Sequence, residues 1–337
     1  MNERIAKLRE QSTGQRPSIS AERALLVTRF YKSIEGQNIS VPVKRAMTFK
    51  YILDHKKIVI NAGELIVGER GPAPQATPTY PEICLHSIQD LDILHERKKV
   101  PFSSDNATRS AYTDEIIPFW TGKTIRDQMF EELPREWQDA YQAGVFTEFM
   151  EQRPPGHTVL DNKIYRKGML DFIREIDEQL EQLMHGGDPE KEQKREQLEA
   201  MKISAAAIID FAKRHAKVLR ELEAKEKDPI RKAELNQMAG ICDHVPAHAP
   251  RTFWEALQYY WFVHVGVITE VNPWDSFNPG RLDQHLLPFY EAGLESGELT
   301  KEGAKEILQS FWVKFNNHPA PPKIGVTAKE SLSLIHI

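Results

Sequence analysis

The stretch from residue 252 to residue 290 constrains the fold more than any other part of the chain. It opens with Thr252-Phe-Trp-Glu255, a capping-box pattern that predicts the start of a helix. Apolar side chains then lie on most sides of this helix, at Phe253, Leu257, Tyr260, Trp261 and Val263. A helix that is apolar on most sides must be covered by other elements, so we expect it in the middle of a large fold.

A break in regular structure follows this helix. Pro273, Pro279 and Gly280 lie close together, and no helix or strand tolerates all three. Asp275 lies between them, directly after Trp274. A carboxylate on irregular backbone that leaves a buried element is typical of a functional site. The same pattern also fits a buried aspartate that caps the next helix.

A second candidate site lies in the loop Glu151-Gln-Arg-Pro-Pro-Gly-His-Thr158. The Pro-Pro-Gly turn presents His157 on backbone of restricted geometry, and an imidazole changes its charge near neutral pH. These residues fit a surface histidine in a turn as well. On the residues alone, the chain is a large α/β enzyme with His157 and Asp275 as possible acid–base groups.

The rest of the pattern predicts a mainly helical α/β protein with a few short strands. Helical periodicity covers residues 43–55, 163–184, 190–227 and 300–312. Thr300 is expected to cap the last of these helices, and Asp228-Pro229 is expected to start one more. Short strands are expected at 58–60, 65–67 and 323–327. Four prolines predict irregular backbone over residues 71–81. After them, Tyr80, Glu82, Cys84 and His86 alternate, which places their side chains in a cavity or on a solvated edge.

Composition excludes several classes of function. The net charge of −5 and a pI of about 6.2 give no reason to expect nucleic acid or a membrane surface as a partner. The most apolar run, residues 256–268, is too short and too polar to span a bilayer. The first residues are charged and do not form a signal peptide. Two cysteines far apart favour a reducing, cytoplasmic location.

One cluster has the residue types of a metal site. Cys242, His244 and His248 are closely spaced, but no fourth ligand lies near them. We therefore expect no metal, and a metal-binding protein that uses these three residues is an alternative.

Several separated motifs resemble the glycyl radical enzymes of the pyruvate formate-lyase family. Residues 274–290 are similar to the family signature Gly-Arg-x-Asp-Gln-Tyr/His-x-x-Pro-Phe-Tyr. Glu64-Leu-Ile-Val-Gly68, Pro81-Glu82, Thr252–Gln258 and Leu308–Asn316 also resemble that family. Within it, residues 146–158 and 271–277 are most similar to the members that dehydrate trans-4-hydroxy-L-proline. The resemblance runs from about residue 1 to Glu330.

The resemblance implies that the chain is the N-terminal portion of a ten-stranded α/β barrel. It implies no bound cofactor, but a radical on a backbone glycine near the C-terminus of the family domain, which is relayed through a cysteine. A partner enzyme of the radical-SAM type, with an iron–sulfur cluster, installs that radical. A homodimer is implied for the full-length protein.

By resemblance, the full-length enzyme is expected to eliminate water from trans-4-hydroxy-L-proline or a close relative. His157 is expected to hydrogen-bond the leaving hydroxyl. Asp275 is expected to orient His157 or the substrate, or to pair with the ring ammonium. Phe149 and Trp274 are expected to bind the substrate by walling the pocket.

The chain departs from the family in ways that affect these expectations. It has no Gly-Cys-x-Glu loop and no Arg-Val-x-Gly-Tyr loop, and residues 331–337 resemble nothing in the family. We therefore expect residues 1–330 to be the N-terminal part of the domain, followed by a foreign tail. The glycine radical domain would be absent and this chain inactive. The alternatives are another reaction of the family and a non-catalytic, partly folded fragment with exposed strand edges. The other reactions are formate C-acetyltransfer, a different C–O, C–N or C–S elimination, and arylacetate decarboxylation.

Overall fold

The computed structural model describes residues 2–98, 100–143, 145, 160–185, 187–271 and 278–319. The helices are α1 (Glu3–Thr13), α2 (Glu22–Ser33), α3 (Val41–His55), α4 (Ile88–Glu96), α5 (Asn106–Ala111), α6 (Ile117–Trp120), α7 (Ile125–Glu132), α8 (Arg135–Gln142), α9 (Met169–His185), α10 (Lys191–Glu223), α11 (Pro229–His244), α12 (Phe253–Glu270), α13 (Leu282–Ser296) and α14 (Lys301–Asn316). A π-helical turn, η1 (Tyr112–Ile116), precedes α6, and a 3-10 turn, η3 (Lys163–Tyr165), precedes α9. The strands are β1 (Ser18–Ser20) and β2 (Ala76–Pro78).

The prediction of a mainly helical chain with few strands is confirmed. The predicted helix starts are also confirmed: Thr252 and Thr300 cap α12 and α14 by accepting hydrogen bonds from the backbone amides of Glu255 and Gly303. Asp228 caps α11 in the same way, with a proline in the first turn. These starts were predictable because capping uses residues within one turn of each other.

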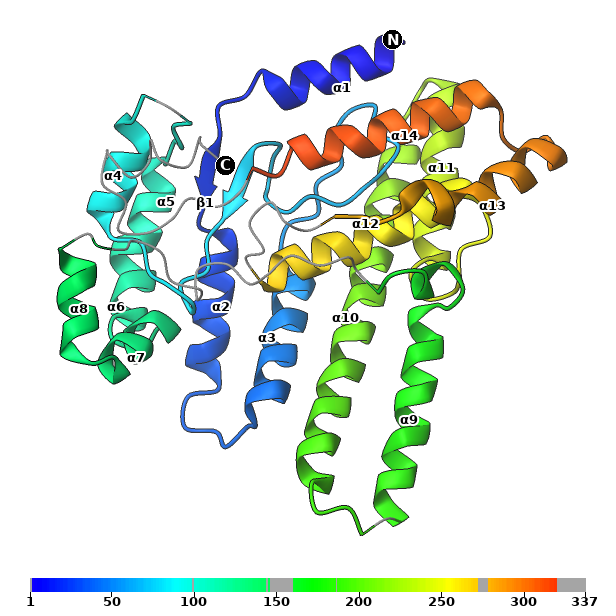
Figure 1. The fold of residues 1–337 in the computed structure, drawn as a ribbon. Helices are drawn as coiled ribbons and strands as arrows, with labels where there is room; N and C mark the ends of the chain where they lie inside the picture. Colours follow the sequence, from blue (N-terminus) through cyan, green and yellow to red (C-terminus); the bar gives the residue numbers. More distant parts are fainter. Residues whose placement is uncertain are drawn as a thin grey trace.

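Helix α12 lies in the middle of the described structure (Figure 1). The hairpins α2–α3 and α9–α10 extend to one side of it, and α1 and α14 run along the other. Most of α12 is buried, and Trp261 and Phe262 are fully inaccessible. The expected position of this apolar helix is therefore confirmed.

A second, smaller core joins α2 to the segment from α4 to α6. It is formed around Ile19, Val27, Leu94, Tyr112 and Trp120. Two of its aromatic side chains also satisfy their polar atoms there. The Tyr112 hydroxyl lies 2.6 Å from Thr79 Oγ1, and Trp120 Nε1 donates to Thr28 Oγ1 at 2.8 Å.

The strands predicted at 58–60 and 65–67 are wrong. The backbone of residues 62–70, which we call the 62–70 segment, is bonded by side chains instead of by another strand. Gln258 of α12 both accepts from the Val67 amide and donates to the Val67 carbonyl, each at 2.8 Å. On the same helix face, Trp254 Nε1 donates to the Leu65 carbonyl at 2.7 Å and Trp261 Nε1 donates to the Gly68 carbonyl at 2.8 Å. Since residues 254, 258 and 261 share one helix face, that face takes the place of a strand partner.

The two observed strands are parallel and pair Ser18 with Ala76 through Ser20 with Pro78. The second of them lies in the proline-rich stretch that we predicted to be irregular throughout, so that prediction is wrong for residues 76–78. Gly71 explains how the chain folds back before β2. A Cβ atom at Gly71 would lie 2.2 Å from the carbonyl oxygen of Ala76, a separation that only glycine avoids.

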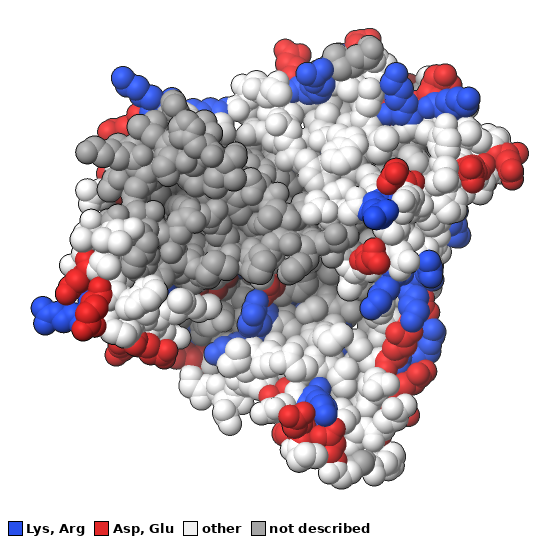
Figure 2. Space-filling view, in the orientation of Figure 1, with Lys and Arg blue, Asp and Glu red and all other residues white. Residues whose placement is uncertain are grey.

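Where Figure 2 draws described residues, charged side chains of both signs are intermixed, and neither sign forms a large field among them. Ion pairs such as Lys202–Asp177 connect α10 to α9. Among the helices that the structure describes, none is long and apolar enough to cross a membrane.

Candidate functional site

Phe149, His157, Trp274 and Asp275 all lie outside the described residues. The structure therefore gives no position for the four predicted site residues. It does define the chain on both sides of them. Glu270 and Val271 precede the segment with Trp274 and Asp275, and Leu160 follows the segment with Phe149 and His157.

The end of α12 is held by side chains from distant parts of the sequence. Arg23 Nε donates to the Thr269 carbonyl at 2.5 Å, and Arg70 Nε donates to the Ile268 carbonyl at 3.1 Å. The Tyr80 hydroxyl also donates to the Ile268 carbonyl. A helix leaves its last carbonyls without intrahelical partners, and its C-terminal end favours cations. Both requirements are met here.

Arg23 is buried, and its charge is compensated by Glu82. One guanidinium nitrogen donates to Glu82 Oε2 at 3.1 Å and the other to Glu82 Oε1. Burial alone would lower the pKa of Arg23, but the Glu82 carboxylate outweighs it and the pKa is raised above its ordinary value. The guanidinium also lies over the ring of Tyr80, 4.0 Å from its centroid. We call Arg23, Arg70, Tyr80 and Glu82 the arginine clamp.

Arg23 and Arg70 lie in no motif that would predict a role for them from the sequence. The alternation of Tyr80 and Glu82 was the available signal, and the structure places both side chains inward. His86, in the same alternation, is also buried, and burial lowers its pKa to about 4. Cys84 is half-buried.

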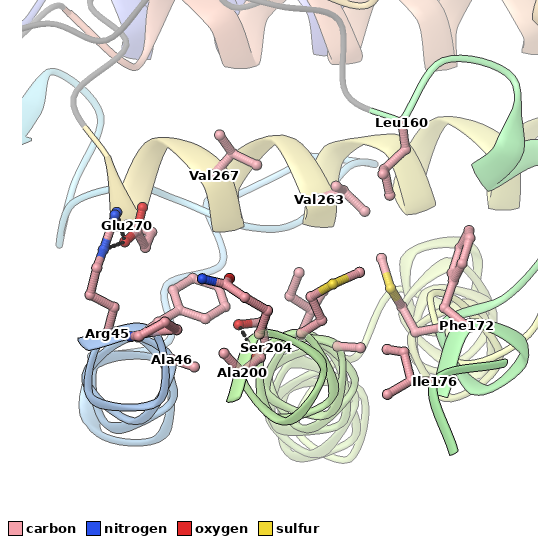
Figure 3. A pocket seen from close by; sticks show the side chains of 17 residues that line it. Arg45, Ala46, Leu160, Phe172, Ile176, Ala200, Ser204, Val263, Val267 and Glu270 are labelled. Atoms are coloured by element: carbon pink, nitrogen blue, oxygen red, sulfur yellow. Dashed lines mark hydrogen bonds and ion pairs between the residues drawn. The ribbon is translucent and has the colours of Figure 1, made fainter. Parts of the chain in front are cut away.

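An apolar groove of about 570 Å³ runs between α12 and the helices α3, α9 and α10 (Figure 3). Arg45 and Glu270 lie at one end, where Arg45 Nε donates to Glu270 Oε1 at 3.0 Å. Leu160 and Phe172 lie toward the other end. The groove thus receives the last side chain of α12 and the first described side chain after residue 159. The chain flanking both candidate loops reaches one groove.

The backbone after residue 159 turns sharply. Leu160 and Asp161 both have positive φ, at 50° and 48°. Asp161 Oδ1 lies 3.5 Å from His285 Nε2, and the His285 ring stacks on Tyr165 with centroids 5.0 Å apart. These contacts hold residues 161–165, which lead into α9, against His285 of α13.

A second cluster of polar side chains, which was not predicted from the sequence, lies between the 62–70 segment and the end of α14. Lys314 Nζ donates to Glu64 Oε2 at 2.8 Å and to Glu69 Oε1, and His318 Nε2 lies 2.7 Å from Glu69 Oε2. We call these four residues the buried charge cluster. The Glu64, Glu69 and Lys314 side chains are at most 3% exposed. Despite burial, which raises it, Lys314 and His318 lower the pKa of Glu69 to about 2.

Asn61 and Asn317 complete the hydrogen bonds of this cluster. Asn61 Nδ2 donates to both carboxylates, at 3.1 Å to Glu64 and 2.6 Å to Glu69. Asn317 Nδ2 donates to Glu69 Oε1 at 3.1 Å. The cluster joins the 62–70 segment to the end of α14, and buried charges are tolerated there because each is paired and hydrogen-bonded.

Cys242, His244 and His248 do not converge on a common point that could hold a metal ion. Within residues 2–319, apart from the stretches that the structure does not describe, no group of three or more His, Cys, Asp or Glu could hold a metal ion. The Cys242 thiol is buried, which raises its pKa well above the ordinary value. His244 Nε2 lies 2.9 Å from the Ala249 carbonyl, and its ring stacks on His248.

Comparison with known proteins gives one consistent result. A family model described as pyruvate formate lyase-like matches residues 1–333. The chain is 49% identical to trans-4-hydroxy-L-proline dehydratase from Clostridioides difficile over 329 residues, which are 98% of this chain and 42% of that protein. It is 33% identical to isethionate sulfite-lyase from Oleidesulfovibrio alaskensis, over 93% of this chain and 39% of the relative.

The fold agrees with these matches. A crystal structure of hydroxyproline dehydratase from Clostridioides difficile, with trans-4-hydroxy-L-proline bound, superposes with a TM-score of 0.93 at 48% identity. The match covers 98% of this chain and 42% of that structure. The chain therefore spans about two fifths of the length of the relatives that it matches.

Proposed function

This chain belongs to the pyruvate formate lyase-like family, and on that basis we propose that it supplies part of the substrate chamber of a glycyl radical dehydratase. The proposed substrate is trans-4-hydroxy-L-proline or a close relative. The match to a structure with that substrate bound, at a TM-score of 0.93 and 48% identity, carries this proposal. Residues 1–330 are proposed to form the N-terminal part of the family domain.

The chemistry requires help with the leaving group. In the complete enzyme, the family's radical would take a hydrogen atom from the substrate and return one to the product after the hydroxyl has left, so that the net change is the loss of one water. The neighbouring hydroxyl must then depart, and it leaves far more easily as water than as hydroxide. A positioned acid contributes roughly two to four orders of magnitude to such a step.

We assign that positioned group to His157, which would donate a hydrogen bond to the leaving oxygen. Asp275 would hold His157 in the correct orientation or pair with the ring ammonium of the substrate. Phe149 and Trp274 would cover the substrate and exclude water, which a radical intermediate requires. The described structure supports this arrangement because the chain flanking both loops, at Leu160 and Glu270, reaches one groove.

The radical relay of this site is proposed to use neither Cys84 nor Cys242. Cys242 is buried with a raised pKa, and Cys84 is half-buried, and neither is among the described residues that line the groove. Neither cysteine therefore fits a radical relay at this site. We propose a radical-SAM activating enzyme as partner, a homodimer, and a location in the cytoplasm.

The test is turnover by the protein expressed from its complete reading frame and activated in the absence of oxygen. We expect trans-4-hydroxy-L-proline to be converted to a product lighter by one water. Isethionate is the matched alternative substrate, because the chain is also 33% identical to an isethionate sulfite-lyase. Release of sulfite from isethionate without dehydration of hydroxyproline would make isethionate the substrate. Formation of formate from pyruvate and coenzyme A would point instead to the pyruvate formate-lyase reaction.

The site assignment has its own test in the same enzyme. His157→Ala and Asp275→Asn are expected to lower kcat by at least about a hundredfold, because a positioned acid is worth roughly that much. The yield of glycyl radical and the melting temperature should stay near those of the unaltered protein. Near-normal turnover in both variants would contradict the assignment.

A further inference from the structure

We propose that the arginine clamp is a positioning device for the segment that leaves α12, and that Arg23 is its central residue. This inference rests on the proposed function, since it concerns the segment that carries Asp275. It adds residues that lie far from that segment in the sequence: Arg23 on α2, Arg70 at the end of the 62–70 segment, and Tyr80 and Glu82 after β2.

The hydrogen bonds of Arg23 are saturated. An arginine side chain has five N–H donors in one plane. Those of Arg23 reach the carbonyls of Thr79, Thr269 and Glu270 and both oxygens of Glu82. This side chain of α2 thus links the residues that follow β2, Thr79 and Glu82, to the end of α12.

Tyr80 and Arg70 bind the Ile268 carbonyl, one residue before the two carbonyls that Arg23 binds. Arg70 donates to the Tyr80 hydroxyl, and that hydroxyl donates to the Ile268 carbonyl, which also receives Arg70 Nε. The Val267 carbonyl accepts from the Val271 amide at 2.9 Å. All four final carbonyls of α12 therefore have partners, and three of them are held by the clamp.

This arrangement fixes both the position and the direction in which the chain leaves the helix. Three consecutive carbonyls are bonded to buried side chains from three other segments, so the last turn cannot rotate or fray without breaking charge-assisted bonds. A misplacement of about 1 Å in a catalytic group lowers the rate by up to about a hundredfold. A loose exit from α12 would therefore reduce turnover even if the fold survived.

Lysine cannot replace Arg23 in this role. An ammonium group has three donors around one point, whereas the acceptors here lie around a planar fork. Arg23→Lys keeps the charge that Glu82 requires but must give up some of the contacts to α12. Arg29→Lys is the matched control, because Arg29 lies on the same helix, is 53% exposed, and pairs with Glu115 at 2.9 Å.

The first measurement is turnover by the activated protein expressed from its complete reading frame. In Arg23→Lys, we expect kcat per radical-bearing subunit to fall about 10- to 100-fold, with Arg29→Lys unchanged. A residue with a structural role alone would lower the melting temperature and the radical yield but leave kcat per radical unchanged. Equal kcat values per radical in the two variants would overturn the proposal.

The second measurement is hydrogen exchange on the 337-residue chain, which needs no turnover. Backbone amides of residues 266–271 should exchange at least about tenfold faster in Arg23→Lys than in Arg29→Lys, while those of α10 stay alike. Equal exchange in both variants would also overturn the proposal. If the unaltered enzyme does not dehydrate hydroxyproline, the proposed function fails, and exchange alone decides on the clamp.

Discussion

Replacing Lys314 with methionine should be among the most destabilising single changes in the chain. Methionine has a similar length and fits the apolar surroundings of α14, so the main loss is the ammonium group. Glu64 and Glu69 would then be two buried carboxylates without a cation, although Asn61 and His318 would still donate to them. Removing one partner of a buried ion pair costs about 3–5 kcal/mol.

The free energy of binding a proton gives a similar magnitude for this loss of stability. The variant can relieve the repulsion between the carboxylates by binding a proton. Protonating a carboxylate with an ordinary pKa of 4.5 costs about 3.4 kcal/mol at pH 7, at 1.36 kcal/mol per pH unit. Uptake of one proton by one of the two carboxylates therefore limits the loss in free energy of unfolding to roughly 3–4 kcal/mol.

The loss in free energy of unfolding should therefore depend on pH. Burial already raises the pKa of Glu64 in the unaltered protein, and removal of Lys314 raises it further, so in the variant the contribution of this carboxyl is favourable at low pH and is lost as the pH rises. The stability difference between the unaltered protein and Lys314→Met should shrink by about 1.4 kcal/mol for each pH unit from pH 7 down to about pH 5. Glu69→Gln combined with Lys314→Met should recover part of the loss at pH 7.

The assay is urea-induced unfolding of the chain followed by circular dichroism at pH 7 and pH 5. Lys305→Met is the control, since Lys305 is an exposed residue of the same helix. A loss of less than about 1 kcal/mol at pH 7, or a loss that does not change with pH, would refute the reasoning, because buried charges would then not be responsible.

Two further predictions concern the core. His215 is buried, and burial lowers its pKa to about 3, so its neutral form stabilises the fold fully above pH 6.5 and this contribution is lost as the pH falls toward 3. Stability should drop by about 2 kcal/mol between pH 6.5 and pH 5 on its account, and unfolding of His215→Gln should lack that drop if the assignment is right. Gln258→Leu should cost about 2–5 kcal/mol in urea unfolding, because the Val67 amide and carbonyl would both lose their partner. Unfolding of Gln258→Leu at the same urea concentration as the unaltered protein would contradict this role.

The helices could be predicted because their signals are local. Thr252, Thr300 and Asp228-Pro229 mark starts within one turn of the residues they cap, and apolar periodicity follows directly. The strand predictions failed because an apolar run such as Leu65-Ile-Val67 indicates burial and not a bonding partner. Gln258 and Trp254 supply that partner from about 190 residues away.

The candidate site was predicted differently. His157 and Asp275 stood out because nearby glycines and prolines predict irregular backbone around them. The resemblance of their motifs to the family gave them roles, and these roles remain predictions. The residues that hold the frame around them gave no such signal. Arg23 and Glu82 are ordinary charged residues in the sequence and become informative only when the structure shows Arg23 buried, paired with Glu82 and bonded to the end of α12.

By itself, the sequence determined the helical segments, their caps, the central position of the 253–270 helix and membership of the family, because each depends on neighbouring residues or on ordered motifs. Only the tertiary structure decided how buried polar groups are satisfied. Lys314 and Glu64 are 250 residues apart, and Arg23 and Thr269 are 246 apart. Local patterns carry no information about which distant partner will compensate a buried charge or complete the end of a helix, since that depends on how the elements pack.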